Sequence, residues 1–280
     1  MKGQVRKSVI AGTWYPGSPA VLRSEIEQYF QDLPSPGISG EVVGLVSPHA
    51  GYVYSGRIAA HACGLVRGMQ FESVIMIGPS HRSLFPGISV YSGGGFETPL
   101  GIVPVDAATA ERIIDHSGLV HSSAAPHLQE HSLEIQLPLL QVALGNFRFV
   151  PILMGSQDRK TCEDLAGAVF RAAEGKNVLI VASSDLSHYH SYERAVRKDG
   201  LILKQVERMN ADGLLRELEK GEAEACGGGP MAAVLMACKK MGCNASKILA
   251  YANSGDVTGD RSGVVGYMAA AFYRRTGGNG

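Results

Sequence analysis

The sequence predicts an α/β fold whose central mixed or mostly parallel β-sheet is flanked by helices on both faces. Three short apolar runs, each closed by turn-forming residues, are typical of buried strands: residues 42–46, 73–77 and 178–182. Longer stretches between these runs repeat apolar residues every three or four positions, as amphipathic helices do. Strands that alternate with helices in this way favour a sheet that is covered on both sides.

The alternation continues along the chain of 280 residues without an internal repeat or a low-complexity linker. We therefore predict a single domain over residues 1–280, although the length alone would also allow two smaller ones. The glycine-rich end, residues 277–280, is expected to be a disordered tail.

Charge and hydropathy exclude two classes of partner. The 26 basic and 26 acidic residues cancel, and no basic block or basic amphipathic helix interrupts the chain, so neither nucleic acid nor a membrane surface is an expected partner. No segment is long and apolar enough to span a bilayer, and residues 1–20 lack the apolar core of a signal peptide. We expect a cytoplasmic protein.

Capping and breaking residues set the bounds of the elements in the first half. Serine and aspartate are favoured helix N-caps, proline is favoured in the first helical turn, and glycine runs favour loops. In order, we expect a helix after Ser18, strand 42–46, a loop over 50–56, a helix over 57–67, strand 73–77, a short strand over 88–91 and a helix capped by Asp106.

The second half repeats the pattern. A helical stretch that begins near Glu130 would place His131 at a helix N-terminus, where it could hydrogen-bond a bound anion or oxygen species, or simply belong to the cap. Beyond it we expect strand 148–154, helix 158–174, strand 178–182, helices 192–209, 212–220 and 230–240, and strands 248–252 and 264–272.

Three histidines follow three predicted strands. His49, His81 and His188 each lie in the loop that a buried strand enters at its carboxyl end, which is where open α/β sheets bind their ligands. A single histidine is more often structural, but three in equivalent places predict a shared site.

The residue types at this edge indicate a transition metal. His49 and His81 offer two neutral imidazoles, and a third ligand is needed for tight binding. The candidates for this third ligand are Cys226, Asp185, Glu130 and Glu134. In the stretch from Asp185 to His188 a carboxylate precedes an imidazole by three residues, a spacing that suits a histidine oriented as an acid/base; alternatively, Asp185 merely caps the following turn.

Cysteine usage singles out Cys226. Five irregularly spaced cysteines without a CxxC pair argue against a disulfide framework or a structural zinc site. Cys226 precedes a glycine run and a predicted helix N-terminus, which would make its thiol accessible and favour the thiolate; a buried cysteine in a turn is the alternative. Trp14, the single tryptophan, is either a pocket wall or a core lid.

Six ordered motifs carry a family resemblance that covers nearly the whole chain, from Thr13 to about Phe272. The motifs are PHAGYVYSG, IGPSH, EHSLE, SSDLSH, ACGGGP and YANSGD. Together they resemble the Memo family, also known as component B of the AMMECR1–Memo–radical-SAM gene set. The Memo family is in turn similar in fold to the class III extradiol dioxygenases, which are non-haem Fe(II) enzymes with two histidines and one glutamate as metal ligands.

The resemblance implies a role for each matching residue. It implies His49, His81 and Cys226 as metal ligands, His188 as an acid/base, and His131, Trp14 and Tyr54 as substrate-pocket residues. The role of Asp185 in orienting His188 rests on their spacing alone. Cys226 stands where the dioxygenases carry glutamate. A thiolate is softer than a carboxylate and can be oxidised, so the resemblance supports a metal pocket more firmly than it supports ring cleavage.

Two functions remain open on these grounds. The first is a metal-dependent oxidoreductase for which Fe(II) is the expected metal, with copper or zinc as alternatives. The second is a non-catalytic metal-binding or adaptor protein that uses the same pocket for a ligand or a peptide. In either case the expected partners are a small-molecule or peptide ligand, and AMMECR1-like and radical-SAM proteins.

Overall fold

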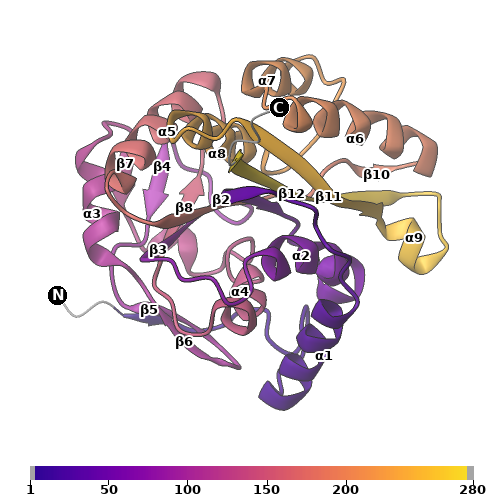
Figure 1. The fold of residues 1–280 in the computed structure, drawn as a ribbon, viewed down its shortest axis with the longest axis horizontal. Helices are drawn as coiled ribbons and strands as arrows, with labels where there is room; N and C mark the ends of the chain where they lie inside the picture. The colour runs from indigo at the N-terminus through magenta and orange to yellow at the C-terminus, as the bar shows by residue number, and fades with distance from the viewer. Residues whose placement is uncertain (1–3, 276–280) are drawn as a thin grey trace.

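A computed structural model describes residues 4–275 of the chain (Figure 1). Its strands are β1 (Val5–Arg6), β2 (Gly40–Ser47), β3 (Ser73–Pro79), β4 (Ile88–Val90), β5 (Gly95–Thr98), β6 (Gly101–Pro104), β7 (Val120–Ser122), β8 (Phe149–Met154), β9 (Val178–Ser183), β10 (His188–His190), β11 (Ala245–Asn253) and β12 (Val264–Arg275). The predicted tail, residues 277–280, lies outside the described residues.

The strands within this described part form one large mixed sheet and one small sheet. The large sheet has nine strands in the order β10-β12-β2-β9-β3-β8-β4-β7, with β11 paired to β12. Its centre, β2-β9-β3-β8, is parallel, whereas β12 and β4 run antiparallel to their neighbours β2 and β8. The small sheet joins β1, β5 and β6. The prediction of a mixed central sheet is confirmed.

The helices pack on both faces of the large sheet. They are α1 (Pro19–Gln31), α2 (Tyr52–Leu65), α3 (Ala107–Asp115), α4 (Gln136–Leu144), α5 (Arg159–Ala173), α6 (Tyr192–Glu207), α7 (Ala211–Glu219), α8 (Gly228–Lys240) and α9 (Ser254–Thr258), with a 3-10 turn, η1, at Ala125–His127. None of these described helices is both long and apolar enough to cross a membrane.

Alternating strand residues supply two separate cores. Leu45 of β2 and Met76 of β3 point into one core with α1, α2 and α4. Their neighbours Val46 and Ile77 point into the other, with α3, α5, α6, α7 and α8. Because successive strand residues face opposite sides, an apolar run is buried on both faces only when helices cover both. The α/β fold with helices on both faces is therefore confirmed.

Two element boundaries differ from the predictions in ways that affect the site. Residues 50–56 are not a loop, because α2 already begins at Tyr52 with Gly51 as its N-cap. Gly56, which favours a loop in isolation, instead lets α1 approach closely: a Cβ there would lie 2.8 Å from the ring of Tyr29. Helix α4 begins only at Gln136, so His131 precedes it by five residues and does not stand at a helix N-terminus. Tertiary contacts outweighed local propensity at both places.

The tight packing of α8 against β2 can be tested at Gly44. A Cβ added at Gly44 would lie 2.4 Å from Sγ of Cys238 and 3.2 Å from the ring of Phe272. We expect Gly44→Ala to lower the free energy of unfolding by about 1–3 kcal/mol, as overpacked cores do. Gly200→Ala, on the exposed side of α6 with nothing within 4 Å, should raise it by about 0.5–1 kcal/mol. Urea denaturation of both variants measures the difference; equal midpoints would contradict it.

Candidate metal centre

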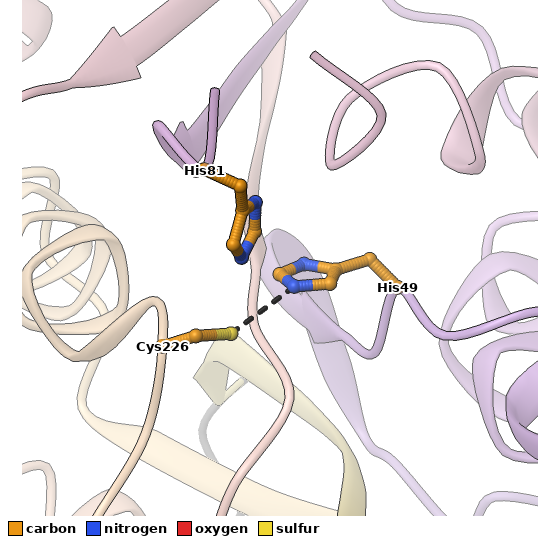
Figure 2. Close-up of side chains that lie close together, drawn as sticks. All are labelled: His49, His81 and Cys226. Atoms are coloured by element: carbon orange, nitrogen blue, oxygen red, sulfur yellow. Dashed lines mark hydrogen bonds between the residues drawn. The ribbon is translucent and has the colours of Figure 1, made fainter. Parts of the chain in front are cut away.

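The carboxyl edge of the central parallel strands brings three ligand-bearing side chains together. His49 lies two residues beyond β2, His81 lies two residues beyond β3, and Cys226 lies two residues before α8. One ligand atom from each side chain lies within 4.8 Å of the others. Figure 2 shows the two imidazoles and the thiol pointing toward one common point. Among the predicted third ligands, Cys226 is the one placed with both histidines.

Hydrogen bonds define which nitrogen of His49 is available. The hydroxyl of Ser183 donates to the carbonyl of Ser132 at 2.6 Å, so its oxygen accepts from His49 Nδ1 at 3.0 Å. The lone pair is then on Nε2, which lies 3.1 Å from Sγ of Cys226. Burial lowers the pKa of His49 well below its ordinary value, and the neighbouring His81 adds to this effect. His49 is therefore a neutral imidazole that presents Nε2 to the centre.

His81 is held by a buried carboxylate. Its Nδ1 lies 2.9 Å from Oε1 of Glu130, and its backbone N–H donates to Oε2 at 2.6 Å. Burial would raise the pKa of Glu130, but the hydrogen bonds from His81 and Ser132 outweigh burial and hold that pKa well below its usual range. Glu130 therefore contacts the centre through His81.

Cys226 is partly exposed, but its environment differs from the prediction that the thiolate is favoured. Burial raises the pKa of Cys226, and the nearby Asp185 raises it further, so the metal-free group is a thiol. Helix α8 begins at Gly228, and the glycine before it serves packing: a Cβ at Gly227 would lie 2.5 Å from the carbonyl oxygen of Ser183. The glycine run thus allows the Cys226 segment to pack against the end of β9, and desolvation outweighs the helix dipole.

The predicted pairing of Asp185 with His188 is wrong in its geometry. The carboxylate of Asp185 accepts the backbone N–H of His49 at 2.7 Å, and within residues 4–275 no hydrogen bond joins it to His188. Burial raises the pKa of Asp185 to about 7. Asp185 therefore holds the His49 loop, because the turn after β9 directs its side chain toward β2.

A different carboxylate holds the segment that carries His188. Asp199, buried in the middle of α6, accepts the backbone N–H of Ser187 at 3.0 Å and the hydroxyl of Tyr251 at 2.8 Å. No local pattern in the sequence points to Asp199, since it lies in a helix eleven positions after His188. His188 itself lies in β10 and not in an open loop, and burial lowers its pKa.

Most of the predicted site residues border a cleft of about 820 Å³. Of the predicted residues, its lining includes His49, His81, His131, Asp185, His188, Trp14 and Tyr54. Cys226 is not part of this lining; it borders a neighbouring cavity of about 490 Å³, to which His188 also contributes.

Aromatic stacking joins the N-terminal segment to the centre. The ring of His131 lies between Trp14, with centroids 4.4 Å apart, and His81, with centroids 4.6 Å apart and the planes tilted by 26°. Burial lowers the pKa of His131 to about 4, so this ring is neutral and can stack on His81 without charge repulsion. Trp14 is a pocket wall that supports the two histidines.

A buried ion pair holds Trp14 in place. Glu134 pairs with Arg6 at 2.6 Å and accepts the hydroxyl of Tyr15 at 2.9 Å and the backbone N–H of Ile10 at 3.1 Å. All the hydrogen bonds of this carboxylate go to the segment before and after Trp14, so Glu134, one of the predicted ligand candidates, has a structural role.

Comparisons with known proteins give the fold and the family of the chain. The structure is similar to the crystal structure of an uncharacterized protein from Escherichia coli K12, with a TM-score of 0.55 over 82% of this chain and 99% of that one; at 14% identity this likeness concerns the fold alone. Among curated proteins, a MEMO1 family protein of Methanobrevibacter smithii is 39% identical, covering 96% of this chain and 99% of its own. Another, from Aeropyrum pernix, is 40% identical over 95% of this chain and 99% of its own.

The model of the Memo-like protein family matches residues 6–271, which include every residue that lines the cleft. The resemblance predicted from the six motifs is confirmed, and this chain belongs to the Memo family.

Proposed function

We propose that this chain binds a transition metal ion through His49, His81 and Cys226 and acts as a metal-dependent oxidoreductase on a small molecule held in the cleft. The observation that supports this most directly is the approach of three ligand atoms, from three separate segments, to within 4.8 Å of one another.

The donor set suits a transition metal. Two neutral imidazoles and one sulfur are ligands for iron, copper and zinc, whereas magnesium and calcium prefer oxygen. Such an ion would supply Lewis acidity and, as iron or copper, a redox centre. We expect Fe(II), with copper or zinc as the alternatives that a soft sulfur ligand favours. Two of the ligands border the cleft, so a bound molecule there would lie beside the centre.

His188 is the proposed proton acceptor. It borders the cleft, and burial lowers its pKa, so near neutral pH it is an uncharged base. Asp199 keeps the backbone next to it in place, which restricts the position of the imidazole. Asp185, with a pKa of about 7, is a second titratable group on the same cleft wall.

A second function, recognition of a peptide or a partner protein, is favoured by the rim of the cleft. Val53, Tyr54 and Tyr189 border the cleft and are 69%, 42% and 80% exposed. Exposed apolar side chains around a concave site are typical of binding surfaces. AMMECR1-like and radical-SAM proteins are the partners to test, and metal-dependent turnover of a small molecule would separate the first function from the second.

The role of Cys226 can be tested with cobalt and zinc. Cys226→Ser should weaken zinc binding at least tenfold, about 1.4 kcal/mol, because the hard hydroxyl replaces a soft sulfur ligand. It should also abolish the near-ultraviolet sulfur-to-cobalt charge-transfer absorption of Co(II)-loaded protein. Competition with a chromophoric chelator gives the affinities.

Cys238→Ser is the matched control, since Cys238 is buried in α8 away from the cluster. It should keep both the zinc affinity and the charge-transfer absorption. The same absorption in Cys226→Ser would show that another side chain supplies the sulfur and would refute the proposed ligand set.

Asp185 predicts a pH dependence of stability in the metal-free protein. Its folded pKa is about 7, above its ordinary value of 3.8, so between these values the unfolded chain has lost a proton that the folded chain keeps. The free energy of unfolding should therefore fall as pH rises from 4 to 7, by up to about 4 kcal/mol for this group.

Asp185→Asn removes this titration, so its stability should fall less over the same range, as measured by denaturation at each pH. Asp115→Asn, on the exposed end of α3, should follow the wild-type curve. Parallel curves for wild type and Asp185→Asn would mean that Asp185 is ionised at low pH in the folded protein.

A further inference from the structure

We propose that Glu130 is a positioning residue of the metal centre, whose carboxylate holds the His81 imidazole in the tautomer that carries its proton on Nδ1 and its lone pair on Nε2. The inference rests on the proposed metal binding, but the tautomer is a property of the metal-free protein. Metal-bound histidines commonly donate their second ring N–H to a carboxylate in this way.

Glu130 contacts His81 at two points. Oε2 accepts the backbone N–H of His81 at 2.6 Å, while Oε1 lies 2.9 Å from Nδ1 of the same residue. One contact fixes the main chain just after β3, and the other fixes the ring that extends from it. Together they restrict both the position and the rotation of the imidazole.

Backbone N–H groups also hold the carboxylate of Glu130 in place, and toward all of them it acts as a hydrogen-bond acceptor. Oε1 also accepts the N–H groups of His131 and Ser132, each at 2.9 Å. Both carboxylate oxygens thus accept hydrogen bonds from backbone N–H groups. Glu130 is therefore an acceptor toward His81, so Nδ1 of His81 must donate, and Nε2 keeps the lone pair.

The same contacts argue against Glu130 as a direct ligand of the centre. Glu130 is 2% exposed, and its oxygens are engaged by three amides and the far side of the His81 ring. Glu130, His81 and His131 do offer ligand atoms within 4.8 Å of one another, so a second ion shared by these three side chains is the rival explanation. An ion bound at this second site would have to take the place of the hydrogen bond between Glu130 and His81.

The negative charge of Glu130 should also affect which metal ion binds more tightly. A Cys226 thiolate and the Glu130 carboxylate carry two negative charges, which a divalent ion neutralises and a monovalent ion does not. Electrostatic attraction grows with the charge of the ion. Removing the charge of Glu130 should therefore weaken the binding of Zn(II) more than that of Cu(I).

The first experiment reads the tautomer directly. Long-range ¹H–¹⁵N correlation spectra of the metal-free protein distinguish the Nδ1–H from the Nε2–H form of each imidazole, and His81→Gln identifies the His81 signals. We expect the Nδ1–H form for His81 in the wild type and loss of this preference in Glu130→Gln. An Nε2–H form of His81 in the wild type would overturn the proposal, whether or not Glu130→Gln folds.

The second experiment measures affinity. Glu130→Gln should lower the Zn(II) affinity by 10- to 100-fold, the range typical of such outer carboxylates, and the Cu(I) affinity by a smaller factor. Glu130→Asp, which keeps the charge but retracts it by one methylene, should lie between wild type and Glu130→Gln. It also provides the comparison if Glu130→Gln does not fold.

Glu224→Gln is the matched control, because Glu224 forms a similar carboxylate–histidine contact, 2.7 Å from Nε2 of His190, outside the ligand cluster. It should leave the His81 tautomer and the Zn(II) affinity unchanged.

Wild-type Zn(II) affinity in Glu130→Gln would overturn the proposal. Two zinc ions per chain, with one lost in Glu130→Gln, would establish the rival second site. A wild-type protein that binds no zinc would refute the metal centre itself, and the tautomer would still show whether Glu130 orients His81.

Discussion

The parallel pairing of β2, β9 and β3 is the constraint on which the centre depends. Ser47 pairs with Ser183 in register, and the backbone N–H of Ser184 continues the ladder to the carbonyl of Ser47 at 3.0 Å. The strands therefore end at the same edge of the sheet, and the loops that follow them lie close together there. His49, His81 and the turn after β9 lie at that edge. Cys226, in the segment just before α8, lies next to the two histidines.

Buried hydrogen bonds hold the residues at this edge in defined positions. Ser183, Glu130 and Glu134 are each almost completely buried, and each joins segments that are far apart in the chain. A buried polar group without a partner costs about 1–3 kcal/mol, so a shift of one segment would break several contacts at once. The ligand positions are thus set by the polar network behind them as well as by the backbone.

Electrostatics in the metal-free centre favours uncharged groups. Burial lowers the pKa of His49, raises that of Cys226 and raises that of Asp185 to about 7, and in each case the charged form is the one that desolvation penalises. A cation bound at the proposed site would change this balance, because it would favour a thiolate beside it.

Local patterns in the sequence determined the sheet, the two helical layers, the grouping of His49 and His81 at one edge, and membership of the Memo family. These features follow from apolar periodicity and short motifs, which are properties of neighbouring residues. Only the tertiary structure decided that Asp185 holds His49, that Asp199 supports the His188 segment, and that Cys226 is a desolvated thiol. Hydrogen-bond partners and burial depend on which distant segments pack together, and spacing along the chain does not encode that choice.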